Sequence, residues 1–235
     1  MSVSTTVTID SLPKYVDYVS GRFVEGACMY RGVTDASYEL IPSLGRTRTT
    51  PNMDGYVFDG EKNMVNIFRN EHMAYTEHRA ENDWELLVLA QHHGMPTRLL
   101  DWSFSPLIAL YFALIQPTQA DRAVYAFETV ESKLPFGGSG ETSDPGPFKI
   151  TTPRILVPRH HNRRVTVQAS IFTVHAVPWE PLQVPNLVKI IIPQGSVPVV
   201  RDQLFMVGIT PKTVFPDVGG LCHWLRLLKF GYAFE

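Results

Sequence analysis

Polar, hydrogen-bonding side chains interrupt an otherwise apolar stretch of this chain between Leu89 and Ala113. An imidazole, a guanidinium or a carboxylate that is buried without a partner costs several kcal/mol, so such groups must satisfy one another or contact a ligand. We interpret the stretch as part of a ligand-binding site. The residues concerned are Gln91, His92, His93, Thr97, Arg98 and Asp101.

A second charged group, Arg31, stands in the apolar stretch 27–33 and is followed by Gly32. A guanidinium fork matches the geometry of a phosphate or a carboxylate, and the glycine would leave room for that ligand. The alternative is a buried ion pair between Arg31 and Asp101, which by itself stabilises a fold only weakly. Both interpretations hold together if Asp101 orients Arg31 or Arg98.

Gln168 opens a stretch of alternating polar and apolar residues, where a polar side chain could face a cleft. The densest group of basic residues in the chain lies just before it. These residues could contact phosphates, or they could form a solvated loop. They are Arg154, Arg159, His160, His161, Arg163 and Arg164.

Several other kinds of site are disfavoured. Cys28 and Cys222 are far apart, and no ligand stands at helical spacing from His92 or His93 to complete a metal site. Adjacent histidines on a helix point about 100° apart, so these two cannot serve one site. The Gly-x-Ser-x-Gly motif of serine hydrolases and the glycine motifs of Walker and Rossmann sites are missing. We therefore expect no metal and no tightly bound cofactor.

The composition is that of a soluble globular protein, with 44% apolar and 19% charged residues in a chain of 235. A net charge of -2 gives no global field that would recruit nucleic acid or anionic lipid. The chain has no apolar run of roughly 18 residues and no basic, apolar leader. Its two cysteines favour a reducing compartment. We expect a cytoplasmic protein that does not contact a membrane.

Apolar periodicity and turn residues predict an α+β fold in a single domain spanning 1–235. In it, helices of the N-terminal half pack on a mainly antiparallel sheet that is formed largely by the C-terminal half. Loops are expected over 38–59 and 95–100, and a flexible insertion over 131–150. Strands are expected over 27–33, 123–127, 165–177, 187–193 and 205–209. Helices are expected after Asp10, over 61–78, after Asp83, over 107–115 with Ser105 as the N-cap, and after Asp217.

Taken together, these segments resemble the FRG domain, a family named for its Phe/Tyr-Arg-Gly motif, which is present here as Tyr30-Arg31-Gly32. The resemblance extends over nearly the whole chain. Its longest block is QHHGMPTRLLDWS over 91–103, and further blocks are Ser105-Pro106 with 109–113, Arg164 with Gln168 and 172–175, and 208–209 with 214–217 and 220–221. We expect ligand-binding roles for Tyr30, Gly32, Gln91, His92, His93, Thr97, Arg98, Asp101, Ser103 and Arg164.

The order of these motifs is also similar to that of ADP-ribosyltransferases of the arginine-serine-glutamate type. That resemblance implies a split sheet and catalytic roles for Arg31, Ser105 and Gln168, with NAD as the substrate. Gln168 stands where the family carries a glutamate that holds a ribose hydroxyl and stabilises a cationic transition state. Asp101 and Glu128 are candidates for supplying a carboxylate instead.

Three functions remain open from the sequence. The first is an NAD-dependent ADP-ribosyltransferase or NAD glycohydrolase, which passes ADP-ribose to a protein, a nucleic acid or water and acts as a bacterial or phage toxin or effector. The second is a module that binds a nucleotide or nucleic acid without reaction, which the neutral Gln168 favours. The third is an internal polar network that merely fixes the fold.

Overall fold

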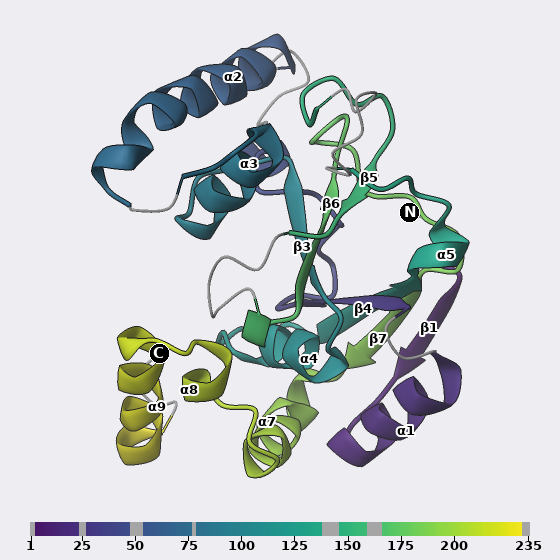
Figure 1. Cartoon of the computed structure of the whole chain (residues 1–235). Coiled ribbons are helices and arrows are strands. Elements are labelled where there is room, and N and C mark those ends of the chain that lie inside the picture. The colour runs from purple at the N-terminus through teal and green to yellow at the C-terminus, as the bar shows by residue number, and fades with distance from the viewer. Residues whose placement is uncertain are drawn as a thin grey trace.

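In the computed structural model, the described residues are 3–23, 27–47, 54–76, 79–137, 146–158 and 166–231. Within them, seven strands form one open sheet (Figure 1). Its spatial order is β1-β7-β4-β2-β3-β6-β5. The strands are β1 (Thr5–Thr8), β2 (Cys28–Val33), β3 (Leu99–Ser103), β4 (Arg122–Glu128), β5 (Arg154–Leu156), β6 (Ser170–Val174) and β7 (Val188–Ile192).

The sheet is mainly antiparallel, as predicted, and its one parallel pair among the described strands is β1 with β7. Neighbours β2 and β4 pair over six residues, and β3 and β6 over five. By contrast, β2 and β3 are paired at a single position, Tyr30 opposite Ser103. The described sheet therefore divides at this junction into a four-stranded part and a three-stranded part.

The α+β class is confirmed, because the sheet is mainly antiparallel and carries helices. Among the described residues, however, helices and strands are interleaved, so the expected separation of helices from strands is not seen. β1, β2 and β3 come from the N-terminal half, and three helices follow the last strand. The described helices are α1 (Leu12–Arg22), α2 (Asp54–Glu71), α3 (Asp83–His92), α4 (Pro106–Leu114), α5 (Thr129–Ser132), α7 (Val197–Met206), α8 (Pro211–Val214) and α9 (Val218–Phe230), with short 3-10 turns η1 (Gly45–Thr47), η3 (His72–Ala74) and η4 (Gln194–Ser196).

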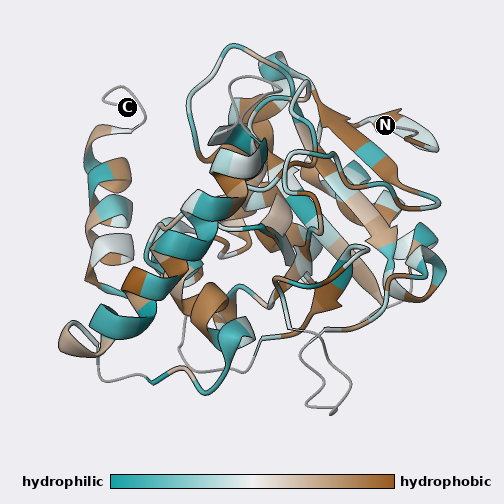
Figure 2. Cartoon of the chain, turned by 90° about the horizontal axis from the view of Figure 1, so that it is seen from above, coloured by the Kyte–Doolittle hydropathy of each residue, from teal (hydrophilic) through white to brown (hydrophobic). Residues whose placement is uncertain are grey.

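Two groups of helices cover the two parts of the sheet. Helices α1, α4 and α7 bury apolar side chains with β4 and β7, whereas α2 and α3 do so with β3 and β6 (Figure 1). Figure 2 shows that the central strands are mostly hydrophobic and that hydrophilic residues concentrate on the outer helices. Burial of these apolar surfaces is the main force that holds the layers together.

Gly32 allows β2 to lie directly against α4. A Cβ atom at this position would stand 1.9 Å from the carbonyl oxygen of Ala109 and 2.6 Å from the backbone nitrogen of Ala113. The glycine also lines the pocket described below. Its missing side chain nevertheless makes room for a helix backbone, which differs from the expectation that it makes room for a ligand.

Several local predictions are wrong. The segment 205–209, predicted as a strand, lies at the end of α7 and in the turn after it, because Val197, Val200 and Leu204 bury one face of a helix. Residues 99–100, expected as the end of a turn, are the first two residues of β3. The caps of α1 and α3 are Ser11 and Asn82, one residue after and one residue before the predicted ones.

The predicted insertion is only partly described, because 138–145 lie outside the described residues. Its first part forms the end of α5, and Phe136 then makes a parallel bridge with Ile155. In the part of the chain that the structure describes, no helix combines the length and the apolar character needed to span a lipid bilayer. The same residues hold no cluster of side chains suited to a metal ion.

Candidate functional site

A cavity of about 900 Å³ opens where the sheet divides. Its walls come from β2, β3, β6 with the preceding Gln168, the segment 34–46, α3, α4 with the two residues after it, and Phe215. The strands diverge beyond the Tyr30–Ser103 pair, so side chains of both parts of the sheet can face one space. Arg31, Asp101, Ser103 and Gln168 all line this pocket, although up to 137 positions separate them in the sequence (31 to 168).

Arg31 reaches across the junction from β2 to β3. Its side chain is 17% exposed, and Nη1 donates a hydrogen bond of 2.6 Å to the carbonyl oxygen of Asp101. The same nitrogen lies 3.7 Å from Asp101 Oδ2. Burial lowers the pKa of Arg31, Asp101 opposes that effect, and Arg46 adds to it. A largely buried guanidinium with one loosely placed carboxylate retains a strong attraction for an anion.

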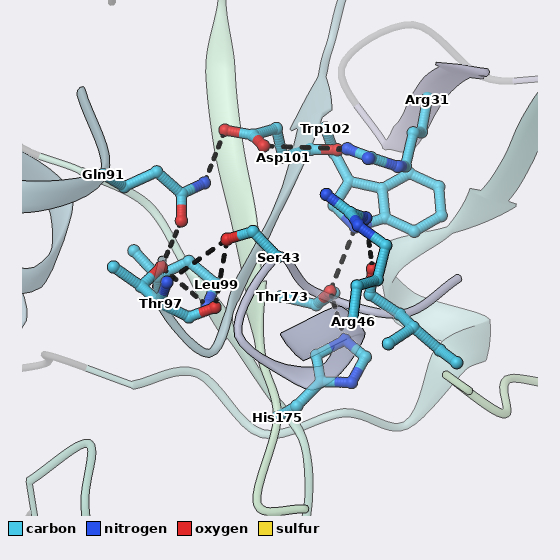
Figure 3. A network of polar contacts seen from close by, with 11 residues as sticks. Arg31, Ser43, Arg46, Gln91, Thr97, Leu99, Asp101, Trp102, Thr173 and His175 are labelled. Atoms are coloured by element: carbon cyan, nitrogen blue, oxygen red, sulfur yellow. Dashed lines mark hydrogen bonds and ion pairs between the residues drawn. The ribbon is translucent and has the colours of Figure 1, made fainter. Parts of the chain in front are cut away.

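A relay of side chains holds Asp101 in place (Figure 3). The hydroxyl of Thr97 donates to Gln91 Oε1, and Gln91 Nε2 donates to Asp101 Oδ1 at 2.7 Å. In Figure 3 the Asp101 carboxylate lies between the Gln91 amide and the Arg31 guanidinium. Thr97 is fully buried and lies outside the pocket lining, so it supports the site rather than contacting a ligand.

The two serines predicted at this site have structural hydrogen bonds. Ser105 is the N-cap of α4, its Oγ accepts from the Ile108 amide, and it lies outside the pocket lining, which does not favour a catalytic role. Ser103 lines the pocket, but its Oγ donates to the carbonyl oxygen of Gln168 at 2.6 Å and accepts from the Ser105 amide at 3.0 Å. Ser103 thus fixes the position of Gln168.

Gln168 lines the pocket and is half-buried. Its Nε2 donates a hydrogen bond of 3.2 Å to the carbonyl oxygen of Val214, at the end of α8. The next residue, Ala169, has a φ of 45° and thus a left-handed backbone conformation, which changes the direction of the chain before β6. The amide is therefore anchored to the C-terminal segment that also places Phe215 in the pocket wall.

The remaining predicted residues divide between the pocket and its surroundings. Tyr30 and His92 line the pocket, whereas His93 is exposed and lies outside the lining at the end of α3. This placement fits the expectation that the adjacent histidines do not serve one site. Arg164 and the neighbouring basic residues Arg159, His160, His161 and Arg163 lie outside the described residues. Arg154 donates to the carbonyl oxygen of Phe136.

Arg98, predicted to bind ligand, instead forms a buried ion pair. Its Nε and Nη2 form a fork with the carboxylate of Glu61, and its Nη1 donates to the carbonyl oxygen of Pro147. The rings of Phe58 and Phe148 flank the guanidinium. These partners occupy donors of Arg98 away from the pocket, and Arg98 lies outside the pocket lining, which does not favour the ligand-binding role predicted for it.

Sequence reasoning missed several pocket residues. Arg46 and Glu39 contribute charge, and Tyr38, Phe112 and Phe215 contribute aromatic surface. The rings of Phe112 and Phe215 meet edge to face at 6.0 Å. Tyr38, Glu39 and Arg46 lie in the segment that was predicted to have no regular structure, which gave no periodicity from which to orient a side chain.

Beneath the pocket, a buried chain of hydrogen bonds fixes Trp102. Its Nε1 donates to Thr173 Oγ1 at 3.0 Å, Thr173 lies 3.3 Å from His175 Nε2, and His175 Nδ1 lies 3.4 Å from the carbonyl oxygen of Glu180. A neutral imidazole that donates from Nδ1 and accepts at Nε2 satisfies each of these contacts. Desolvation accordingly lowers the pKa of His175 to about 4.

Acidification is therefore expected to destabilise the fold through His175. The unfolded chain binds a proton at this residue near pH 6.5 and the folded chain near pH 4, so its contribution is complete above pH 6.5 and is lost as the pH falls towards 4. Between pH 7.5 and pH 5 the loss is about 2 kcal/mol. Urea unfolding of the wild type and of His175→Asn at both pH values measures this loss. The decrease in the free energy of unfolding between the two pH values should be smaller by this amount in His175→Asn. An equal pH dependence in both proteins would contradict the assignment.

Part of the chain is similar to a known family. Residues 26–122 match the family described as the FRG domain. The match contains Tyr30-Arg31-Gly32 and the block 91–103, whereas Gln168 and the later blocks lie outside it. Neither a curated protein nor a solved structure matches the chain.

Proposed function

We propose that this chain, which carries an FRG domain over residues 26–122, binds NAD where its sheet divides and cleaves the bond between nicotinamide and ribose. One observation carries the proposal. Arg31, Ser103 and Gln168, which match the three motifs of the transferase pattern in their chain order, line a single pocket. A cavity of about 900 Å³ is large enough for a dinucleotide.

In this proposal Arg31 binds the phosphates, and the side chain of Gln168 contacts the ribose next to nicotinamide. The reaction breaks the bond between C1′ of that ribose and the nicotinamide nitrogen, and the bonding electron pair leaves with nicotinamide. Water or a nucleophile of an acceptor then bonds to C1′ and loses a proton. Positive charge develops on the ribose before the new bond is complete.

Asp101 is the residue we propose to stabilise that charge. Its carboxylate lines the pocket, is held by Gln91 and has a side chain that is 62% exposed. An oriented anion beside a developing cation lowers the barrier in a way that the neutral Gln168 does not. Glu128, the other candidate carboxylate, lies at the end of β4 and outside the pocket lining.

Cleavage of NAD would suit a toxin or effector, because either depletion of NAD or ADP-ribosylation of a protein or nucleic acid disables a cell. Calorimetric titration with NAD, followed by chromatography for nicotinamide and ADP-ribose, tests the proposal. We expect saturable binding and release of nicotinamide. Absence of NAD binding would refute it.

A second candidate function is nucleotide binding without reaction. It is favoured by the amide of Gln168, which is anchored to Val214 and carries no charge. Binding of NAD that leaves it intact after long incubation with protein and nucleic acid acceptors would support this module and exclude the enzyme.

A further inference from the structure

A second guanidinium, that of Arg46, lines the same pocket as Arg31. It comes from η1, in the segment that precedes α2, whereas Arg31 comes from β2. Figure 3 shows both guanidinium groups beside the Asp101 end of the polar network. Arg46 is close enough to Arg31 for their repulsion to contribute to the lowered pKa of Arg31.

The position of Arg46 is fixed by the same residue that supports Arg31. The Leu44 amide donates to the carbonyl oxygen of Thr97 at 3.1 Å, and the Thr97 amide donates to Ser43 Oγ at 3.2 Å. The Thr97 hydroxyl begins the relay through Gln91 to Asp101, next to Arg31. Thr97 therefore links the loop that carries Arg46 to Asp101, which in turn accepts a hydrogen bond from Arg31.

Arg46 also keeps hydrogen-bonding capacity for a ligand. Its Nη1 donates to the carbonyl oxygen of Ile41 at 2.7 Å, which orients the side chain, and a guanidinium has five N–H donors in total. Arg31 likewise uses Nη1 for the Asp101 carbonyl oxygen. Each guanidinium can thus be held by backbone on one side and present other donors to the cavity.

Two cations side by side repel each other unless anions lie between them. The described carboxylates of the pocket are Asp101, which lies beside Arg31, and Glu39, which is exposed on the same wall. A ligand with two linked anionic groups would place one against each guanidinium and relieve the repulsion. A single phosphoryl group would offer less negative charge and fewer acceptor oxygens to the same two cations.

We propose that Arg31 and Arg46 form a paired site that selects ligands carrying two adjacent phosphoryl groups, such as a nucleoside diphosphate or a dinucleotide, over nucleoside monophosphates. This inference rests on the proposed binding of a nucleotide and adds to it a second phosphate-binding residue and a selectivity against monophosphates. Arg46 lies outside the motifs that suggested the pocket.

Titration calorimetry with ADP and AMP tests this selectivity. The wild-type protein is expected to bind ADP at least about tenfold more tightly than AMP, because a second charge-assisted contact forms. In Arg46→Gln the two affinities should differ by less than about twofold, with most of the change on ADP. The loop keeps an anchor in this variant, because the Leu44 amide still donates to the Thr97 carbonyl oxygen.

Two controls make the outcome decisive. Arg22→Gln removes an exposed guanidinium at the end of α1, outside the pocket lining, and should leave the ADP to AMP ratio unchanged. Thermal unfolding verifies that Arg46→Gln is folded, and Arg46→Lys, which keeps the charge, should retain part of the preference. A folded Arg46→Gln with the wild-type ratio, or a wild type that binds ADP and AMP equally, overturns this inference and leaves the proposed function standing. A wild type that binds neither of them nor NAD overturns both.

Discussion

Replacement of Arg31 by alanine is expected to lower the affinity for NAD by at least about 100-fold. The variant removes the buried cation that faces the pocket, and a hydrogen-bonded contact between a guanidinium and a phosphate is worth about 1.5–3 kcal/mol for each bond. Release of nicotinamide should fall with binding. Titration calorimetry and chromatography of the reaction mixture measure the two effects on the same sample.

The same variant separates a ligand site from a purely structural network. Arg31 donates to one backbone carbonyl and lies 3.7 Å from one exposed carboxylate, so its loss should change the melting temperature little. Arg22→Ala is the matched control and should behave as the wild type does. If Arg31→Ala instead lowers the melting temperature strongly while the remaining folded protein still responds to NAD, the polar cluster serves the fold and the ligand site is refuted.

Removal of one partner of the buried Glu61–Arg98 pair is expected to cost about 3–5 kcal/mol of folding free energy. Both side chains are almost fully buried, and Glu61 takes two donors of the guanidinium. Glu61→Leu would leave a charged guanidinium in an apolar site between Phe58 and Phe148. Urea unfolding, monitored by circular dichroism, gives the loss directly.

The double variant Glu61→Leu with Arg98→Met is the control for that experiment. It removes both charges together and replaces them by apolar side chains, so most of the lost stability should return. If the double variant is less stable than Glu61→Leu alone, the attraction within the ion pair contributes more to the folding free energy than the cost of the unpaired Arg98 charge. Either way, α2 is expected to depend on this contact, because Glu61 is one of its three buried residues.

The central strands and the best-capped helices could be predicted from the sequence. The apolar run around Val124 forms β4, the run around Ile190 forms β7, and Ser105 and Asp217 cap α4 and α9 as expected. These signals are local, so they need no knowledge of the partner. Strand β1 gave no such signal, because Thr5–Thr8 is short and polar and lies at the edge of the sheet.

The pocket could be predicted in outline but not in detail. An arginine in an apolar strand and polar residues in an apolar stretch identified Arg31, Gln91 and Asp101 as neighbours. The same reasoning could not tell Arg98 from Arg31, because the partner of Arg98 lies 37 positions away in α2. Arg46 is brought to the pocket by tertiary contacts of its loop, which no periodicity reveals.

The order of strands in the sheet sets a lower bound on the length of chain that can fold independently. Residues 26–122 contain β2, β3 and only the first residue of β4, and β2 meets β3 at one position. The other neighbours of these strands are β4 and β6, which lie wholly or almost wholly after this segment. A fragment trimmed to 26–122 would expose unpaired strand edges and is expected to aggregate. A fragment intended to fold on its own must therefore extend at least to the end of β7. It must also begin before β1 if the outer edge of β7 is to stay paired.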